Sequence, residues 1–337
     1  ATMLSSKFKV LATKDHKNSE MGIAKTILNE LKPEHEVFIV EMGAYGKGGI
    51  NLLCSIVKPQ IGIVTGVNEQ HLATFRSMQN LLSAEGGIEL LNNLPKDGLL
   101  VVNGDNKYCI DLYKKAYIDK CVYSLKNDRV DSDIWAEEIS VTEHSLDFMA
   151  MTKRREATHF NVGILGKQNI QNLLGAILVA RELGMSLEEI SLAAKKLEQR
   201  QAGITLRKGV HGLNIIDSSY SSNPDGIIAD LDYLSIFNSK RVLVMPCLIE
   251  LGQKSSEVHH QIGKKIAEVC DMAIITTRDK FEELRDGAVQ NGMSEKNIIF
   301  SDKPKEIFQL ITTFCKKGDA VLLEGRVPGE LIGLLNK

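Results

Sequence analysis

The sequence lacks the features of several large protein classes. Its six cysteines include no Cys-x-x-Cys pair, which argues against a thiol redox motif or a zinc site. No apolar run approaches the roughly 20 residues that span a bilayer. Residues Ala1–Lys9 also lack the basic-then-apolar order of a signal peptide. We therefore expect a cytoplasmic protein whose cysteines are buried, reduced thiols.

Neither sign of charge dominates the chain. It has 41 Lys and Arg residues against 43 Asp and Glu residues, a formal net charge of -2. Electrostatics therefore give no reason to expect a nucleic acid or an anionic membrane as a partner. The glycines match neither G-x-x-x-x-G-K-[ST] nor G-x-G-x-x-G, so the sequence contains no Walker A loop and no dinucleotide fingerprint. At 337 residues the chain is long enough for two domains.

Short β-branched segments alternate with amphipathic helical segments through most of the chain, which predicts an α/β fold. In the first half we expect strands near 8–12, 37–40, 61–65, 98–102 and 120–124, and one helix over Met78–Asn93. From Asp133 to Val162 the period changes to two, which predicts antiparallel strands. A regular βα alternation begins at Leu213 and is typical of a Rossmann-like domain, so we place a hinge at Gln199–Gly203.

Two of the predicted strands end in side chains that bind metals. Glu41 follows the strand Val37–Val40, and His71 follows the strand Ile61–Thr65 after a short polar segment. We expect these to be neighbouring buried strands of a parallel sheet, so that both side chains meet beyond its carboxyl edge, where ligands bind. Each residue alone has a simpler explanation, as a helix cap for Glu41 and a hydrogen-bonded loop residue for His71.

Seven motifs, in this order and at these spacings, resemble the Mur ligase family, ATP-dependent enzymes that join amino acids or peptides to the muramic precursor of peptidoglycan. They are EMGA (41–44), NEQHLATF (68–75), AEGGIEL (84–90), VNGDN (102–106), GKQNIQNLLGA (166–176), IIDSSYSSNPDG (215–226) and IELGQKSSEVHH (249–260). The resemblance implies a P-loop-NTPase-like central domain with a mostly parallel sheet over 1–200, truncated at its start. It also implies a Rossmann-like C-terminal domain over 201–337.

Within the family, the chain is similar to the ligases that add D-alanyl-D-alanine to UDP-MurNAc-tripeptide. This resemblance implies ATP and Mg²⁺ as cofactors and an acyl phosphate intermediate. The expected partners are a UDP-MurNAc-peptide and a D-Ala-D-Ala type dipeptide, with no nucleic acid and no membrane span. We expect a monomer.

The motifs also assign roles to individual residues by resemblance. Glu41 and His71 resemble the magnesium ligands and, with Arg326, the catalytic groups. Four further residues resemble nucleotide contacts, one before the hinge and three after it: Asn169, Asp217, Tyr220 and Asn223. Helix capping is the simpler explanation for Asn169 and Asn223.

The sequence departs from the family pattern in ways that affect catalysis. The family's phosphate-binding loop, GxxGKT/S, is absent, and Gly87 occupies the position of the lysine that becomes carbamylated. The arginine usual after the hinge is also missing, and Glu324–Gly325–Arg326 replaces Lys-Gly-Ser. We therefore expect the chain alone to be inactive. Two alternatives remain open: a catalytically inert paralogue that binds a nucleotide or precursor, and another amide ligase of the superfamily, such as a folylpolyglutamate-type enzyme.

Overall fold

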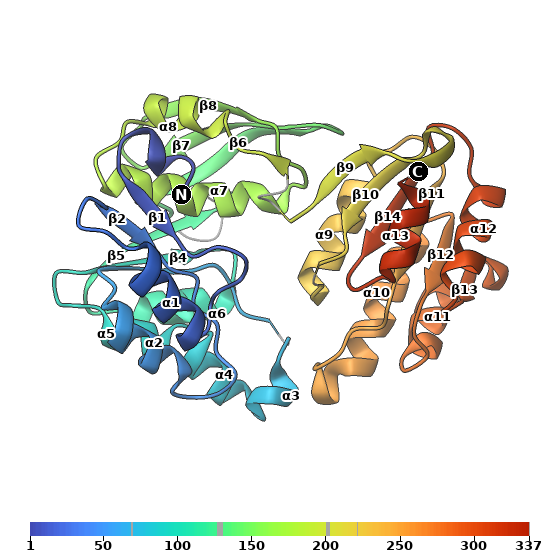
Figure 1. Cartoon of the computed structure of the whole chain (residues 1–337), viewed down its shortest axis with the longest axis horizontal. Helices are drawn as coiled ribbons and strands as arrows, with labels where there is room; N and C mark the ends of the chain where they lie inside the picture. Colours follow the sequence, from blue (N-terminus) through green and yellow to red (C-terminus); the bar gives the residue numbers. More distant parts are fainter. Residues whose placement is uncertain (69, 127–130, 200–202, 221, 337) are drawn as a thin grey trace.

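The computed structural model describes residues 1–68, 70–126, 131–199, 203–220 and 222–336. Figure 1 shows two α/β domains side by side, with the first (blue to green) on the left and the second (yellow to red) on the right. Each domain contains a six-stranded sheet that is mixed and mostly parallel, so the predicted α/β class is confirmed. None of the helices in the described ranges is long and apolar enough to cross a membrane.

The first domain contains two pieces of β-sheet. Strands β1 (Val10–Ala12) and β2 (Val37–Ile39) form a parallel pair. A six-stranded sheet follows in chain order: β3 (Ile61–Val64), β4 (Leu99–Asn103), β5 (Asp119–Ser124), β6 (Ile134–Val141), β7 (Leu146–Thr152) and β8 (Ala157–Val162). Pairing is parallel from β3 to β6 and antiparallel from β6 to β8. The change of period after Asp133 therefore predicted the antiparallel strands correctly.

Helices cover both faces of these strands. They are a 3₁₀ turn (Leu4–Ser6), α1 (Glu20–Glu30), α2 (Gly49–Val57), α3 (Leu72–Phe75), α4 (Met78–Ala84), α5 (Ile88–Asn93), α6 (Lys107–Lys115), α7 (Gln168–Glu182) and α8 (Leu187–Ala194). Helix α7 shares one hydrophobic core with side chains from β1 and β2 and from β3 to β5. The two pieces of sheet thus pack against the same helix.

Strands β2 and β3 are not the neighbouring buried strands that the sequence predicted. β2 is paired with β1 and β3 with β4, and among the described strands no ladder joins β2 to β3. All of β2 is half-buried, and Ile63 of β3 is 42% exposed. The prediction failed because chain order does not fix the order of parallel strands in a sheet, since each pair is joined by a crossover.

The helix predicted over Met78–Asn93 is two helices, α4 and α5. Gly87 separates them with a left-handed backbone, φ 84°, and stands at the N-cap position of α5. A residue with a side chain rarely adopts this conformation, so the glycine is the local reason for the break.

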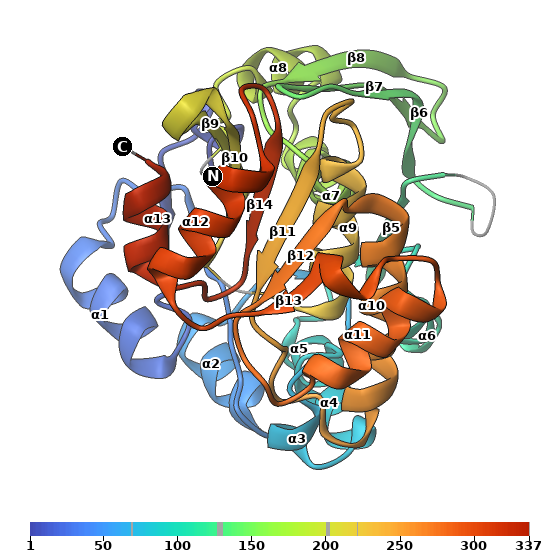
Figure 2. The same cartoon turned by 90° about the vertical axis from the view of Figure 1, so that its right-hand side faces the viewer.

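The second domain has a six-stranded sheet in the order β13-β12-β11-β14-β10-β9 (Figure 2). Its strands are β9 (Thr205–Lys208), β10 (Asn214–Ser218), β11 (Arg241–Met245), β12 (Met272–Ile275), β13 (Ile298–Phe300) and β14 (Ala320–Glu324). Only β9 is antiparallel to its neighbour. The parallel strands confirm the Rossmann-like prediction, whereas β9 was not predicted. The predicted hinge falls largely on residues 200–202, outside the described residues.

Helices pack on both faces of this sheet. One face carries α9 (Pro224–Leu234), α10 (Ser255–Val269) and α11 (Phe281–Gln290), and the other carries α12 (Pro304–Phe314) and α13 (Gly329–Leu335) (Figure 2). Three short 3₁₀ turns complete the domain: Val210–Gly212, Gly252–Lys254 and Glu295–Asn297. Two separate buried cores result, one on each side of the sheet.

Candidate functional site

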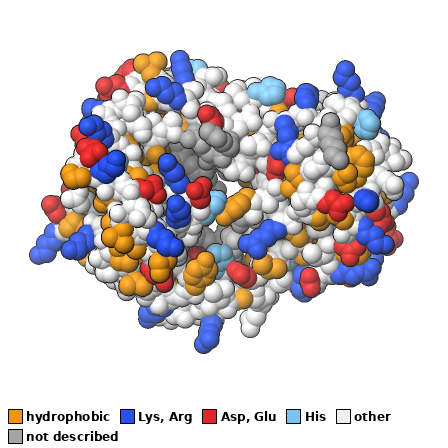
Figure 3. All heavy atoms as spheres, viewed as in Figure 1, with side chains coloured by type: hydrophobic (Ala, Val, Ile, Leu, Met, Phe, Trp, Pro, Cys, Tyr) orange, Lys and Arg blue, Asp and Glu red, His pale blue; other side chains and the backbone are white. Residues whose placement is uncertain are grey.

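The two domains meet through residues that follow the carboxyl ends of their parallel strands. Asn68 and His71 follow β3, and they contact Asn223 and Asp225 after β10 and Glu250 after β11. We call this interdomain surface the seam. Figure 3 shows the molecular surface hollowed between the domains, with histidine and acidic side chains at the rim. Such carboxyl edges are where open α/β sheets bind ligands.

Direct contacts hold the seam together. Asn68 Nδ2 donates to Asp225 Oδ2 at 2.8 Å and to Asn223 Oδ1 at 3.4 Å. The ring of His16, in the loop after β1, stacks on Tyr220 with centroids 4.0 Å apart and planes at 14°. Polar and aromatic contacts of this kind are individually worth about 0.5–1.5 kcal/mol, so the seam can be both ordered and reversible.

His71 lies between two carboxylates from different domains. Its Nδ1 is 3.1 Å from Glu85 Oε1 in the first domain, and its Nε2 is 3.8 Å from Glu250 Oε2 in the second. The hydrogen bond to Glu85 raises the pKa of His71, desolvation opposes this, and the charges of both carboxylates add to the rise. The protonated imidazole is therefore favoured when no metal ion is present.

The loop that carries Glu250 is fixed by a buried histidine. His259 is fully buried, donates from Nδ1 to the Ser255 carbonyl oxygen at 2.6 Å and accepts the Leu248 N–H at Nε2 at 2.9 Å. Using both ring nitrogens in this way requires the neutral tautomer, and burial lowers the pKa of His259. The loop in turn reaches the first domain, where the Ala73 N–H donates to the Glu250 carbonyl oxygen at 3.1 Å.

Glu41 is exposed at the carboxyl end of β2. Its Oε1 accepts a hydrogen bond from Asn18 Nδ2 at 2.9 Å, and its N–H donates to Thr13 Oγ1 at 3.1 Å. Asn18 therefore orients the carboxylate without neutralising it. This environment differs from that of His71, whose partners are Glu85 and Glu250.

Within the described ranges, no group of three or more His, Cys, Asp or Glu side chains is arranged to hold a metal ion by itself. This is compatible with Mg²⁺, which keeps several waters and usually takes only one or two protein carboxylates besides phosphate oxygens. The exposed Glu41 carboxylate fits that donor set. His71 fits it only after losing the proton that Glu85 and Glu250 favour.

The predicted nucleotide contacts have local partners of their own. Asn169 is 5% exposed and lies in the first turn of α7, where its Nδ2 donates to the Leu165 carbonyl oxygen at 2.7 Å. It is not the N-cap of α7, which is Lys167, whereas Asn223 does cap α9 by accepting the Gly226 N–H at 2.9 Å. The capping alternative is thus confirmed for Asn223 and wrong for Asn169.

The other predicted site residues of the second domain lie at or near the carboxyl ends of β10 and β14. Asp217 is the fourth residue of β10, and its Oδ2 is 2.9 Å from Arg207 Nη2 on β9. Its Oδ1 accepts the Ser219 N–H at 3.1 Å. Arg326, just beyond β14, is exposed. Tyr220, Asn223 and the loop after β14 therefore lie beyond the carboxyl ends of their strands, whereas Asp217 is held within its strand by an arginine.

The space at Gly87 is closed to a larger side chain. A Cβ at this position would lie 2.6 Å from Val64 Cγ2 and 2.7 Å from Leu112 Cδ2. Its neighbour Glu89 is buried and accepts the N–H groups of Gly48 and Asn51 at 2.7 and 3.0 Å. The position predicted to correspond to a carbamylated lysine is thus a packed helix start, and the buried carboxylate beside it fixes the glycine-rich loop before α2.

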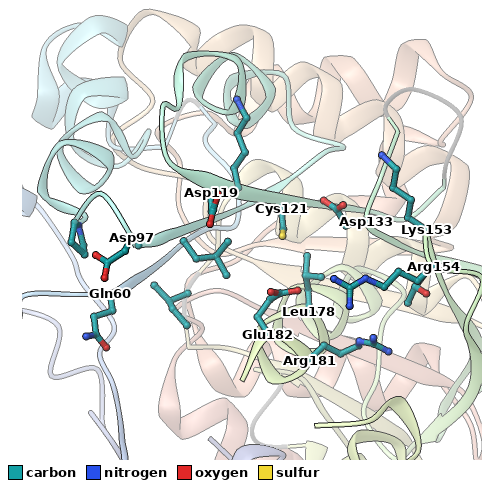
Figure 4. A pocket seen from close by; sticks show the side chains of 16 residues that line it. Gln60, Asp97, Asp119, Cys121, Asp133, Lys153, Arg154, Leu178, Arg181 and Glu182 are labelled. Carbon is teal, nitrogen blue, oxygen red and sulfur yellow. The ribbon is translucent and has the colours of Figure 1, made fainter. Parts of the chain in front are cut away.

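A separate pocket of about 620 Å³ lies at the opposite edge of the first sheet, where β3, β4 and β5 begin (Figure 4). Carboxylates and cations both line it, among them Asp97, Asp119, Asp133, Arg154 and Arg181. The reacting groups of parallel α/β sheets gather at the carboxyl edge, so we assign the chemistry to the seam despite the size of this pocket.

Comparisons with known proteins agree with this two-domain arrangement. A family model described as the Mur ligase middle domain matches residues 1–180, and one described as the Mur ligase glutamate ligase domain matches residues 204–327. The chain belongs to the Mur ligase family.

Two relatives that are similar to this chain are UDP-N-acetylmuramoyl-tripeptide–D-alanyl-D-alanine ligases. The one from Bacillus subtilis is 26% identical over 96% of this chain and 68% of its own length. The one from Escherichia coli is 26% identical over 78% of this chain and 57% of its own length. The aligned part of this chain therefore spans between about half and two thirds of these relatives.

A similar solved structure is the MurF ligase from Thermotoga maritima, in complex with ADP. Its TM-score is 0.85 at 23% identity, and the match covers 99% of this chain and 74% of that one. At this identity the likeness establishes the shared fold, in which two mostly parallel sheets correspond to the middle and C-terminal domains of the family.

Sequence reasoning missed five residues: His16, Asn18, Gln168, Asp230 and Glu250. Asn18 binds the Glu41 carboxylate, and the other four make contacts across the seam. A usable signal existed for the first two, because the polar segment Thr13–Ser19 directly follows a predicted strand. No comparable signal marked Asp230, which lies in the middle of an otherwise ordinary amphipathic helix.

Proposed function

We propose that this chain provides the middle and C-terminal domains, 1–200 and 201–337, of a cytoplasmic, monomeric ATP-dependent ligase that adds D-alanyl-D-alanine to UDP-MurNAc-tripeptide. The observation that carries the proposal is the seam, where polar residues beyond the strand ends of both domains meet (Figure 3). Membership in the Mur ligase family and the names of the relatives support the substrates.

The proposed reaction has two steps. A carboxylate oxygen of the tripeptide attacks the γ-phosphorus of ATP, and ADP leaves to give an acyl phosphate. The amine of the dipeptide then attacks the carbonyl carbon and loses a proton, and inorganic phosphate leaves as the amide bond forms. Phosphoryl transfer depends mostly on positioning and charge neutralisation, so a site between two domains that excludes water suits this chemistry.

We assign roles to the chain's own residues within that site. Glu41 and neutral His71 would hold Mg²⁺, which neutralises phosphate charge when bound. Exposed Arg326 supplies a planar donor for a phosphate or a carboxylate. The nucleotide would be bound by residues of both domains: Asn169 from the first, and Asp217, Tyr220 and Asn223 from the second. Because the contacts are divided between the domains, nucleotide binding would be coupled to domain closure.

The second candidate is an inert binding module. No Gly-Lys-Thr or Gly-Lys-Ser sequence occurs in the 337 residues, and the backbone amides and lysine of such a loop are what cradle β- and γ-phosphates. We therefore expect the chain by itself to show no ATP turnover and no micromolar affinity for ATP in calorimetry. Turnover by this chain alone would contradict that expectation.

A reconstitution assay separates the two candidates. The chain is joined to the amino-terminal, phosphate-loop-bearing part of the Bacillus subtilis relative, and phosphate release is measured with ATP, UDP-MurNAc-tripeptide and D-alanyl-D-alanine. We expect release that requires all three substrates. A folded chimera that binds ADP but releases no phosphate with any combination would favour the inert module.

A further inference from the structure

Two carboxyl groups lie buried together at the seam. Asp230, from α9, is 5% exposed, and Glu324, the last residue of β14, is 1% exposed. Helix α9 packs directly on β14, and the two carboxyl groups lie close enough that each alters the pKa of the other. Two carboxylates in contact at a buried site cannot both be ionised without a large electrostatic cost, because like charges repel and neither is solvated by water.

Among the described residues, the groups that face this pair are neutral. Gln168, at the start of α7 in the first domain, donates from Nε2 to Asp230 Oδ1 at 2.9 Å. The side chains of Ser218, on β10, and Ser222, in the loop before α9, lie beside Glu324, and Ser218 also lies beside Asp230. No cationic side chain contributes to the environment of either carboxyl group among these partners.

Charged residues near the pair in sequence are directed elsewhere. Asp217, next to Ser218, is bonded to Arg207. Asp225 on α9 is exposed and accepts a hydrogen bond from Asn68. Lys167, before α7, and Arg326, after β14, are also exposed. None of these groups therefore neutralises the buried pair.

One carboxyl oxygen lacks a partner when both groups are written as anions. Glu324 Oε2 is buried and accepts no hydrogen bond from the described residues. Leaving a buried charged acceptor unsatisfied is more costly than leaving a neutral one. A proton between the two carboxyl groups removes one charge and turns the contact into a strong hydrogen bond between an acid and a carboxylate.

We propose that Asp230 and Glu324 share a single proton and that this proton keeps the seam closed where α9 meets α7 through Gln168. They are positioning residues, because Gln168 immediately precedes Asn169, and Arg326 lies two residues beyond Glu324. This inference goes beyond the proposed function, and it is tested without any measurement of activity.

The pH dependence follows from the direction of the shift. Burial raises the pKa of Asp230, and burial together with the charge of Asp230 raises the pKa of Glu324 well above its usual value. Between the ordinary carboxyl pKa of about 4 and the raised value, the folded chain holds one proton more than the unfolded chain. Stability from this source is complete below that window and is lost as pH rises through it. Inside the window the unfolding equilibrium constant should rise about tenfold per pH unit.

Denaturant unfolding of the 337-residue chain tests this, over a pH series from about pH 5 to about pH 10. The variants are Asp230→Asn, Glu324→Gln and the double variant, whose amides mimic the protonated pair without titrating. Asp232→Asn, an exposed carboxylate on the same helix, is the matched control. We expect the proton-dependent loss of stability in the wild type and the control, and its disappearance in the double variant.

Two further measurements read the proton and the seam directly. Infrared spectra near neutral pH should show the carbonyl stretch of a protonated carboxylic acid in the wild type and not in the double variant. In small-angle scattering, the radius of gyration should rise at high pH in the wild type but not in the double variant. The infrared band is read in the wild type itself, so detecting the protonated acid does not depend on the stability of any variant.

Either of two results would overturn the proposal. One is an identical pH dependence of stability in the wild type and the double variant. The other is the absence of the acid band together with a dependence of stability on sodium or potassium concentration at fixed pH and ionic strength. The latter would mean that a bound cation, and not a proton, neutralises the pair.

Discussion

Asn68 of the first domain donates a hydrogen bond to Asp225 of the second at 2.8 Å, and its other acceptor, Asn223, is the residue that caps α9. The start of α9 is therefore tied to the loop that follows β3. This contact, with the stacking of His16 on Tyr220, sets the relative orientation of the two domains in the closed seam.

We predict that nucleotide and substrate shift the chain toward the closed seam. Replacing Asn68 with alanine removes its two hydrogen bonds to the second domain and the one that its Oδ1 accepts from the Gln70 N–H. Each is worth about 1 kcal/mol at most, so the variant should sample more open arrangements. Small-angle scattering of the reconstituted ligase, with and without a non-hydrolysable ATP analogue and substrate, measures this. Asn161→Ala, which removes an exposed hydrogen bond to Asp147 away from the seam, is the control. An unchanged radius of gyration at saturating ligand would count against closure.

The proposed metal site can be tested by removing each candidate ligand in the reconstituted ligase. Glu41→Ala and His71→Ala should each lower turnover by at least ~10- to 100-fold, with the fold intact because both side chains lie outside the buried core. Glu34→Ala and His144→Ala remove the same side-chain types at exposed positions and should leave turnover unchanged. Near-full activity of both ligand variants with magnesium would show that the metal site lies elsewhere.

Gly87 makes two predictions. The absence of a lysine at position 87 means that turnover should not depend on dissolved bicarbonate, and rate measurements after depletion of bicarbonate check this.

The substitution Gly87→Ala should destabilise the chain by about 1–3 kcal/mol, because φ is 84° and the Cβ would meet Val64 and Leu112 at 2.6 and 2.7 Å. Gly184→Ala is a matched control, since Gly184 has the same φ and open space around its Cβ. Equal destabilisation by the two substitutions would contradict the claim that close contacts with Val64 and Leu112 add to the cost at Gly87.

The raised pKa of His71 predicts a pH-dependent stability in the absence of metal. Protonated His71 gains from its contacts with Glu85 and Glu250, so its contribution is present below the ordinary histidine pKa of about 6.5 and is lost as pH rises through the raised value. Solvent screening limits this contribution to about 1 kcal/mol. The stability of the wild type relative to His71→Gln should thus shrink as pH rises above about 6.5, and a constant difference would contradict the assignment.

Much of the fold was predictable because local patterns determine it. The strands Ile61–Val64, Leu99–Asn103 and Asp119–Ser124 lie within one residue of the predicted boundaries, since each is a short apolar run that ends at polar residues. The prediction of one helix over Met78–Asn93 failed because a single glycine is tolerated within a helical pattern, so the sequence period does not reveal the left-handed backbone of Gly87 that separates α4 from α5.

The site was predictable only in part. Motifs identified residues at strand ends, but the two carboxylates around His71 come from different domains, and no local pattern pairs them. The proton-sharing partners Asp230 and Glu324 are about ninety residues apart in the chain and meet only through the sheet and helix of the second domain. Long-range contacts of this kind depend on topology, which residue spacing does not encode.

The most direct test of the central claim follows one oxygen atom. In the reconstituted ligase, UDP-MurNAc-tripeptide labelled with ¹⁸O in the reacting carboxylate is converted in the presence of ATP and D-alanyl-D-alanine, and the released phosphate is analysed by mass spectrometry. If an acyl phosphate forms, the carboxylate oxygen that attacked the γ-phosphorus leaves with the phosphate, so each amide formed should yield one phosphate carrying label from that carboxylate. Amide formation with unlabelled phosphate, or no amide from a folded protein that binds all three substrates, would contradict the account.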